Sequence, residues 1–471
     1  MAKIHGLLDI GKRSMMVSQS ALQTTSHNIA NKSTEGYSRQ RVDVTTNPAV
    51  TEGNQRVGTG SAMGSVNRIN NPWLEKQIER EGASFAFLDG QANALQRLES
   101  VFNEQMAKGL SNSMTEFFNS FRELANNPES TVSRTIVKDN AIVMVKNFQD
   151  MDRQLDHVKE DLNKVIESGV NEVNAYIKEI AQLNEKVQQI ELSGSASAND
   201  ERDHRDLLVK KLSEKLDISY AEDPKSGMLN ITAGQTGVIV AGTSHAELKT
   251  STNADNQTQI IYELSRGGTQ VDISDQFKRG ALGGALQMRD GQVMELKEHL
   301  ANLSYAMATE VNRAHVEGFD KYNQGGLDFF DVPPDDNFNI QDLAVNKVIT
   351  EDVSRIAAGA RQNAPGDNTV ANVIHSLQFK PIMGDGHVTF DDFYNSKVGQ
   401  IGVMTQRANS QLESQKNIVE QLRNTREAVS GVSLDEEATK MIEFQKAFEA
   451  SARVIRMADE MFDTVLSLKR M

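Results

Sequence analysis

One short segment of the sequence has the residue types of a catalytic or metal-binding cluster. Asp203, His204 and Asp206 could hold a metal ion, or exchange protons as acid and base. Successive residues on a helix point in different directions, however, so these three side chains do not converge on one point. We therefore predict a structural role, in which Arg205 and the two aspartates form ion pairs at the start of a helix.

Two loops have the composition of ligand-binding loops without the required pattern. A phosphate-binding loop must lead directly into a helix, but residues 65–71, which follow the glycine-rich segment 58–64, carry no helical pattern. The acidic segment 328–336 lacks the glycine and the closing glutamate of a calcium loop. We interpret the first as a bend or hairpin and the second as a solvated loop. His315 with Glu317 is interpreted as a polar helix end packed by tertiary contacts.

The remaining residues supply no other candidate for chemistry. None of the nine histidines has metal-ligand spacing, no nucleophile has a base at a recognisable spacing, and no cysteine is present. We predict no catalytic residue, no metal and no cofactor, hence a protein that is not an enzyme. The net charge of −15 repels phosphate backbones and argues against nucleic acid as a partner. The sequence shows neither a signal peptide nor an apolar run long enough for membrane insertion.

The elements that position these residues are mostly long helices. Apolar residues make up only 38% and aromatic residues 6% of the 471, which favours elongated, two-sided elements over one compact globule. Residues 129–192 hold no proline, and their apolar residues recur at spacings of three and four. One helix of this length would reach about 90 Å. Similar patterns predict further helices at 73–107, 111–125, 285–317 and 391–429.

The sequence between these helices predicts a small inserted β domain. Residues 220–279 contain short β-type runs separated by Gly, Asn, Asp and Ser. We predict a mainly α fold with three domains. They are a terminal coiled-coil domain from 1–65 plus 430–471, a helical body from 66–218 plus 280–429 with loops and hairpins at 318–390, and an outward-facing β domain at 219–279.

Each end of the chain carries one thin apolar seam. Gly11, Ser18 and Ser451 are small or polar residues within these seams, so neither helix is expected to be stable alone in water. We predict that the terminal helices bind each other and neighbouring subunits, and that they are mobile in the monomer. The predicted interaction residues are Ile4, Leu8, Met15, Leu22 and Ile29 at the N-terminus, and Met441, Phe444, Phe448, Ile455, Phe462 and Val465 at the C-terminus.

The charges of the two ends favour this pairing. Residues 1–41 carry six basic and two acidic side chains, whereas residues 433–471 carry six basic and eight acidic ones, so the net charges are +4 and −2. The alternative is two unrelated amphipathic helices, each packed on its own neighbour. Periodicity alone does not separate these two arrangements.

The segment after the first helix resembles a known signature. Residues 26–37 (SHNIANKSTEGY) are similar to the N-terminal signature of the bacterial flagellar axial proteins, the family of rod, hook and hook-associated subunits, and residues 37–40 (YSRQ) continue it in the hook-associated form. Later blocks of the same family are similar to residues 203–208, 283–290, 311–318, 364–368 and 431–438. The signature residues are Asn28, Ala30, Asn31, Thr34, Gly36, Tyr37, Ser38, Arg39 and Gln40.

This resemblance implies a structural subunit of the flagellum at the junction between hook and filament. It implies self-association, with hook protein as the neighbour below and hook-associated protein 3 above. It also implies export through the flagellar type III channel to an extracellular position, and a chaperone on the C-terminal helix before export. The alternatives are another axial subunit, such as a flagellin or hook-associated protein 3, and a hydrolase carried on a rod-like body.

Overall fold

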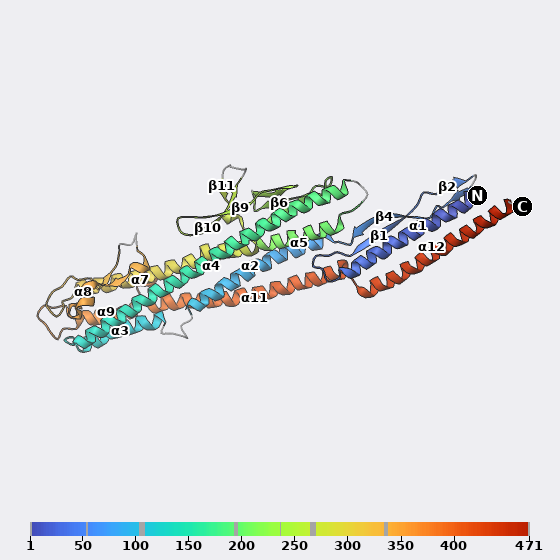
Figure 1. The fold of residues 1–471 in the computed structure, drawn as a ribbon. Coiled ribbons are helices and arrows are strands. Elements are labelled where there is room, and N and C mark those ends of the chain that lie inside the picture. Colours follow the sequence, from blue (N-terminus) through green and yellow to red (C-terminus); the bar gives the residue numbers. More distant parts are fainter. Residues whose placement is uncertain are drawn as a thin grey trace.

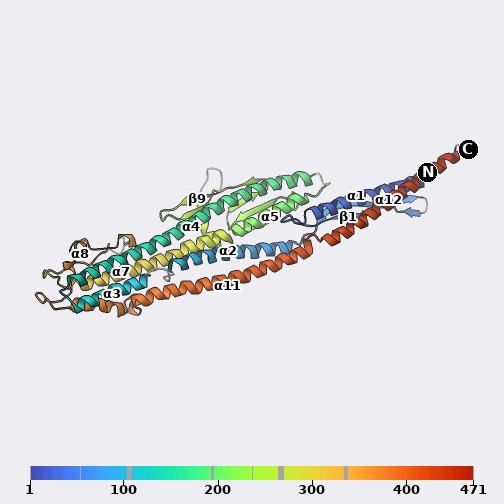
Figure 2. The ribbon, with the colours of Figure 1, turned by 60° about the horizontal axis from the view of Figure 1, so that its bottom comes forward.

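The computed structural model describes residues 2–52, 55–102, 109–192, 196–235, 237–263, 270–333 and 338–469. The molecule is elongated, and both termini lie at one end of it (Figure 1). A narrow arm made by the two terminal helices continues into a thicker bundle of long helices, and a small β region lies on one side of that bundle (Figure 2). The predicted fold class, mainly α with a small inserted β region and paired terminal helices, is confirmed.

The arm consists of two antiparallel helices and a β ribbon. The helices are α1 (Ala2–Ala30) and α12 (Leu434–Lys469). Beside α1 lies the antiparallel pair of β1 (Gln40–Thr46) and β4 (Ser61–Arg68), which is extended by the short hairpin of β2 (Val50–Glu52) and β3 (Gln55–Val57). Of the segment 58–64, residues 58–60 therefore connect β3 to β4 and residues 61–64 begin β4, so no helix follows it directly.

Long helices form the body. They are α2 (Pro72–Phe102), α3 (Leu110–Asn126), α4 (Thr131–Glu191), α5 (Asn199–Lys215), α6 (Gly280–Gln287), α7 (Met294–Val316) and α11 (Phe390–Ser430), with a π-helical turn at Met288–Val293 between α6 and α7. The predicted long helix is confirmed as α4, which begins where the Ser130 hydroxyl accepts a hydrogen bond from the Ser133 amide at 3.2 Å. It continues through Gly169, where a Cβ would lie 2.6 Å from the Leu282 side chain, so glycine permits the close approach of α6.

Aromatic side chains fill the end of the body that lies farthest from the termini. Phe117 and Phe121 of α3 pack edge to face, with ring centroids 5.4 Å apart, and Phe329 and Phe330 lie against them at 5.7 to 5.9 Å. All four rings are at most 1% exposed. Aromatic pairs of this geometry add to the free energy gained from burial, so this end is a well-packed core.

The inserted strands form two antiparallel sheets. The first has the order β5-β6-β7-β8 and the second β11-β10-β9. The strands are β5 (Ile218–Glu222), β6 (Leu229–Ala233), β7 (Gly237–Ala241), β8 (Ser244–His245), β9 (Leu248–Thr252), β10 (Thr258–Glu263) and β11 (Gln270–Asp272), and a 3₁₀ turn at Ser274–Gln276 follows. The predicted β character of this segment is confirmed. Its outward-facing position in an assembly stays a prediction, as do the three domain boundaries.

Three asparagines of α4 hold these sheets against the helix. The Asn174 amide donates to the Leu248 carbonyl at 2.8 Å and accepts from the Leu248 backbone N–H at 2.9 Å. Asn184 makes the same pair of bonds with Leu229, and Asn163 bonds the backbone just before β10 and at its first residue. Each amide thereby satisfies a strand's backbone groups as a neighbouring strand would.

The segment between α7 and α11 folds into short elements on the body. They are β12 (Phe330–Asp331), β13 (Ala344–Val345), α8 (Lys347–Glu351), α9 (Thr369–Ser376) and a turn labelled α10 (Met383–Gly386), with 3₁₀ turns at Ile340–Asp342, Val353–Arg355 and Leu377–Phe379. Residues 334–336 of the predicted acidic loop lie outside the described residues, as do residues 193–195 of the serine-rich run 193–198, which the sequence predicts as a bend between helices. Within the described ranges, no helix is both long and apolar enough to cross a bilayer.

Candidate assembly site

Small residues let the two helices of the arm approach closely. A Cβ on Gly11 would lie 2.8 Å from the Ile455 side chain, and the hydroxyl oxygens of Ser14 and Ser451 are 2.8 Å apart. Near the termini, the rings of His5 and Phe462 pack edge to face, with centroids 5.4 Å apart. The predicted pairing of the first helix with the last is confirmed, and the alternative of two unrelated helices is wrong.

The predicted interaction residues lie along this pair but are only partly covered. All of them are half-buried except Val465, which is exposed. Among the described side chains of α12, only Glu437, Ser451 and Ala458 are buried. Exposed apolar side chains remain on the same helix, including Met457 and Met461. The chain's own packing therefore leaves apolar surface uncovered on the arm, and the role of these residues in binding other subunits stays a prediction.

The signature residues gather where the arm joins the body, around the buried amide of Asn28. The side-chain oxygen of Asn28, Oδ1, accepts a hydrogen bond from the Tyr37 hydroxyl at 2.7 Å and another from the Gln40 backbone N–H at 2.9 Å. Its amide nitrogen donates to the Gln40 carbonyl and to the Glu437 carboxylate, both at 2.9 Å. Asn28 is 1% exposed, so all four hydrogen-bonding positions of its amide are used inside the protein.

Arg39 connects the same point to the last helix. Its guanidinium lies 2.8 Å from the carboxylates of both Glu436 and Glu437, and its backbone N–H donates to the Ser430 carbonyl at 2.9 Å. Glu437 is 1% exposed, and its charge is compensated by Arg39, by Asn28 and by the Lys440 ammonium at 3.8 Å. The first and last segments of the chain are thus fixed to each other through one buried carboxylate.

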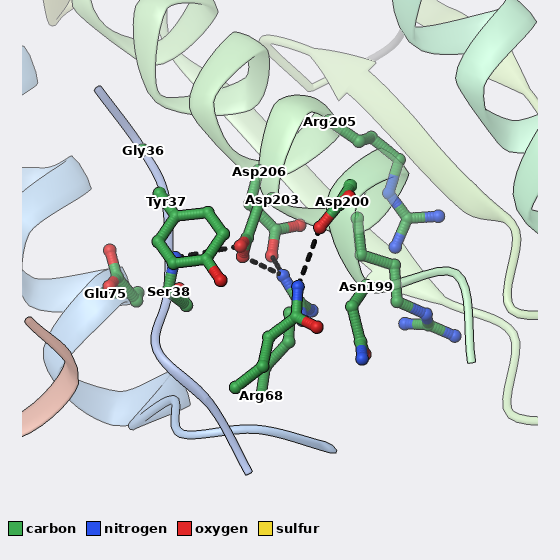
Figure 3. A network of polar contacts seen from close by, with 12 residues as sticks. Gly36, Tyr37, Ser38, Arg68, Glu75, Asn199, Asp200, Asp203, Arg205 and Asp206 are labelled. Carbon is green, nitrogen blue, oxygen red and sulfur yellow. Dashed lines mark hydrogen bonds and ion pairs between the residues drawn. The ribbon is translucent and has the colours of Figure 1, made fainter. Parts of the chain in front are cut away.

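A second set of contacts connects the signature to α5 (Figure 3). The Ser38 backbone N–H donates to Asp203 at 2.8 Å, and Gln40 donates to Asp200 at 2.7 Å. Arg68, at the end of β4, lies 2.7 Å from Asp203 and 2.9 Å from Asp206. Residues from the signature, the ribbon and the start of α5 therefore form one polar network with Glu437 of α12 and Arg426 of α11, and we call this network the joint.

Burial changes the acidity of groups within the joint. Burial raises the pKa of Tyr37, and the neighbouring carboxylates of Asp200, Asp203 and Glu437 raise it further, so the phenol stays protonated and donates to Asn28. Burial also raises the pKa of Asp203, while Arg68 opposes this shift. The arrangement holds segments together, and every acidic group in it already has a structural partner.

The turn between α1 and β1 is shaped by the remaining signature residues. Gly36 has a φ of 84°, which favours glycine, and the Arg426 guanidinium donates to the Gly36 carbonyl at 3.2 Å and to the Tyr37 carbonyl at 3.1 Å. Asn31 donates to the His27 carbonyl at 3.1 Å, and Thr34 donates to Asn31 at 3.1 Å, which closes the helix end. Ala30 is exposed.

The ion pairs predicted for Arg205 and the two aspartates at the start of a helix are present, and they form on different sides of α5. Asp203 and Asp206 pair with Arg68, whereas Arg205 is fully buried on the other side of α5, 2.9 Å from Glu222. The reason is helical geometry, since residues two apart face in opposite directions. A search of the described residues finds no group of side chains that could hold a metal.

Sequence reasoning missed several members of the joint. Arg68, Asp200 and Arg426 had no motif or periodic signal that set them apart. Glu437 and Asp203 lie in two of the later family blocks. Because these blocks and the signature belong to the same family, the resemblance is the signal that could have indicated a contact between them. Their contacts with Asn28, Arg39 and Ser38 span up to 409 positions in the sequence, which no local pattern reveals.

A long helical body that carries a half-covered pair of terminal helices is typical of a subunit that completes its packing in a polymer. Comparison with models of protein families also indicates a subunit of a polymer. The model described as flagellar hook-associated protein FlgK helical domain matches residues 95–330, which are 236 of the 471 residues. The chain therefore belongs to the flagellar hook-associated protein FlgK family. A model of the flagellar basal body rod FlgEFG protein C-terminal matches residues 426–468.

Individual relatives match along nearly the whole chain. Flagellar hook-associated protein 1 of Bacillus subtilis (strain 168) is 29% identical, over 98% of this chain and 97% of its own length. The protein of the same name from Escherichia coli (strain K12) is 24% identical, over 99% of this chain and 100% of its own. The solved structure of the flagellar hook junction protein FlgK from Burkholderia pseudomallei covers 75% of this chain and all of its own, with a TM-score of 0.67 at 14% identity, and so shares the fold.

Proposed function

We propose that the chain is a structural subunit of the bacterial flagellum that forms the junction between hook and filament. Membership in the hook-associated family supports the class of protein, and relatives named flagellar hook-associated protein 1 support the position in the flagellum. The observation that carries the mechanism is the half-covered arm, because its apolar seam stays partly exposed among the described residues of one chain. Burial of that seam by other subunits, at about 25 cal/mol per Å² of apolar surface, drives polymerisation.

The finer partners belong to the same proposal. Hook protein is the neighbour on one side and hook-associated protein 3 on the other, and the subunit reaches its extracellular position through the flagellar type III channel. A chaperone covers the C-terminal helix before export. The apolar side chains left exposed on α12, such as Ile442 and Met457, support the need for such a cover, since exposed apolar surface promotes unwanted association.

Deletion of the gene in the host tests the position in the flagellum. We expect hooks without attached filaments, and filament protein lost to the medium, when cells are examined by electron microscopy and immunoblotting. Normal filaments on the deletion strain would contradict the junction role.

A single substitution tests the arm. Phe448→Asp places a charge on the half-buried seam of α12, so we expect the body to fold normally while incorporation into flagella is lost. Ala450→Asp introduces the same carboxylate at an exposed position of the same helix and should be incorporated. Thermal unfolding by circular dichroism verifies that the body of both variants is intact. Filament formation by the Phe448→Asp strain at the parental level would show that the seam is dispensable.

A further inference from the structure

A cavity of about 310 Å³ lies at the joint, but a second one, of about 460 Å³, lies at the opposite end of the body. This distal pocket forms where the chain enters α4, leaves α7 and approaches α9 (Figure 1). Residues of the later family block 364–368 line it, together with residues 319–321, which directly follow the block 311–318. Neither block has a role in the arm or in the joint.

A buried arginine forms one wall of the distal pocket. Arg134, in the first turn of α4, is 3% exposed. Its guanidinium donates to the carbonyl oxygens of Ile356 and Pro128, the second at 2.8 Å, and its Nε has no hydrogen-bond partner. All of its direct partners are neutral oxygens, so this buried positive charge lacks a contacting carboxylate.

Two further cations lie at the mouth of the pocket. Lys321 and Arg361 are both exposed. The Lys321 ammonium approaches only the Glu129 carbonyl and the Thr131 hydroxyl, each at 3.4 Å. Within the described part of the chain, neither cation forms an ion pair. The pocket therefore combines three positive side chains, and none of them is in contact with a negative group.

Two of the three carboxylates of the pocket, those of Asp320 and Asp367, are already occupied. Asp320 accepts from two backbone N–H groups and lies 2.7 Å from Arg355. Asp367 accepts from the backbone N–H groups of Ala360 and Arg361, at 2.8 and 2.9 Å, and from Thr369. The third carboxylate, of Glu129, is on an exposed residue at the rim. These groups shape the loops and leave the cations available.

A buried charge without a counterion is costly, and a carboxylate placed between cations removes that cost. Burial lowers the pKa of Arg134, and Asp320 offsets this only in part. Guanidinium groups bind carboxylates with two parallel hydrogen bonds, and Arg134 retains an unused donor. The chain itself carries a net charge of −15, so a neighbouring copy offers many carboxylates to the three cations of this pocket.

We propose that the distal pocket binds an aspartate or glutamate side chain of an acidic peptide segment presented by a neighbouring copy of this chain. Arg361 and Lys321 make the first contacts, and the carboxylate then lies near Arg134. The inference rests on the proposed function, because assembly brings the second copy into reach. It adds a polar contact at the end of the body to the apolar contacts of the arm.

Binding of a defined peptide to the monomer tests the chemistry of the pocket. The probe is a hexapeptide of alternating aspartate and glutamate with both ends blocked, titrated into the full chain by calorimetry. We expect saturable binding that weakens with salt, and about tenfold weaker binding for Arg361→Gln and for Lys321→Gln. Arg407→Gln, an exposed arginine of α11, is the matched control and should bind like the parent. Thermal unfolding confirms that each variant is folded.

The other probes separate the possible occupants. The matching peptide of asparagine and glutamine should not bind, and inorganic phosphate should compete only weakly. Saturable binding of phosphate without binding of the acidic peptide would overturn the proposal in favour of a small-anion site. Equal binding by parent and Arg361→Gln would also overturn it.

Cross-linking in detached flagella tests the source of the carboxylate. Carbodiimide joins lysines directly to carboxylates, so we expect Lys321 linked to an aspartate or glutamate of a second copy. Linkage only to a different protein would overturn the choice of partner. Filament assembly in the deletion strain is a separate measurement, so failure of the pocket leaves the proposed junction function intact.

Discussion

The body and the arm are built from helices of similar amphipathic pattern, but they bury very different shares of their side chains. In α4, 23 of 61 residues are buried, and they include long runs of apolar side chains on one face. In α12, only three of the described side chains are buried, and two of these are Glu437 and Ser451. The apolar face of α4 is therefore buried in the chain's own core, whereas the apolar face of α12 stays partly exposed.

This difference assigns the stability of the folded subunit to the body and the contacts of assembly to the arm. The body has enough internal packing to fold in a single subunit, so its surface can vary without loss of the fold. The arm has one partner helix and a thin ribbon, so its final order depends on neighbours. Between them lies the joint, which is a network of hydrogen bonds and ion pairs and therefore sets the direction of the arm without adding a large apolar core.

The largest expected effect comes from a cavity in the body. Phe117→Ala removes a fully buried ring that contacts Phe121, Phe329 and Phe330, and should lower the free energy of unfolding by about 3–5 kcal/mol. Phe444→Ala in the half-buried seam should lower it by much less, because water already reaches that site. Urea unfolding followed by circular dichroism measures both. Equal losses would mean that the arm is as well packed as the body.

The next effect tests the joint. Asn28→Ala leaves the Tyr37 hydroxyl, the Gln40 backbone and part of the Glu437 carboxylate without their partner, and should destabilise the arm by about 2–4 kcal/mol. Because these contacts lie outside the body core, the main thermal transition should change little. Limited proteolysis should then cut within residues 2–40 much faster than in the parent.

Asn31→Ala is the control for this prediction. Asn31 is half-buried and bonds mainly to the preceding helical turn, so its loss should leave proteolysis close to the parental rate. If both variants are cleaved equally fast, any defect in the turn opens the arm, and the buried amide of Asn28 has no special role.

The sequence predicted the helices, the β insert and the pairing of the ends, because each of these depends on periodicity or composition. The spacing of apolar residues in 129–192 was sufficient for α4, and the thin seams were sufficient for a partly exposed arm. Periodicity measures which face of an element is apolar, and that information survives in the folded protein wherever packing is regular.

Polar contacts between segments that lie far apart in the sequence could not be predicted in this way. Asn174 resembles any solvated helical asparagine in the sequence, yet it bonds the backbone of Leu248, and Asn28 does the same for Gln40. Such contacts depend on where a distant segment passes, which is a tertiary property. Arg68 is a further example, since it neutralises Asp203 and Asp206 from the end of a strand 135 residues earlier.

A smaller effect is expected from a titratable group in the body. Glu79 of α2 accepts hydrogen bonds from the Tyr220 hydroxyl at 2.8 and 3.0 Å, and burial raises its pKa to about 7. A raised pKa means that the folded protein holds the proton more tightly than the unfolded chain. The corresponding stability is fully present below the ordinary pKa of about 4.5 and is lost as the pH rises through about 7.

Glu79→Gln should therefore raise the free energy of unfolding at pH 8, on the order of 1–3 kcal/mol, and flatten its decline between pH 4.5 and 7. Tyr220→Phe is the informative partner, because loss of the hydroxyl removes a bond that favours the carboxylate and should move the decline to higher pH. Urea unfolding at a series of pH values measures both. An unchanged pH dependence in Glu79→Gln would assign the decline to other groups.

The smallest free energies of local opening are expected in the arm of the monomer. Amides of α12 should exchange with solvent through local openings of about 0–2 kcal/mol, whereas amides of α4 should approach the free energy of global unfolding. The reason is that α12 packs mainly along α1, while the buried face of α4 contacts the inserted sheets and several helices of the body. Hydrogen exchange with mass spectrometry resolves the two helices in one experiment.

The same hydrogen-exchange measurement on assembled flagella tests whether neighbouring subunits protect the arm. If neighbours supply the missing faces, the same α12 peptides should become protected in the polymer while the α4 peptides change little. Full protection of residues 4–29 and 441–465 in the monomer would show that the arm is already stable alone, and assembly would then require an explanation other than completion of a half-covered seam.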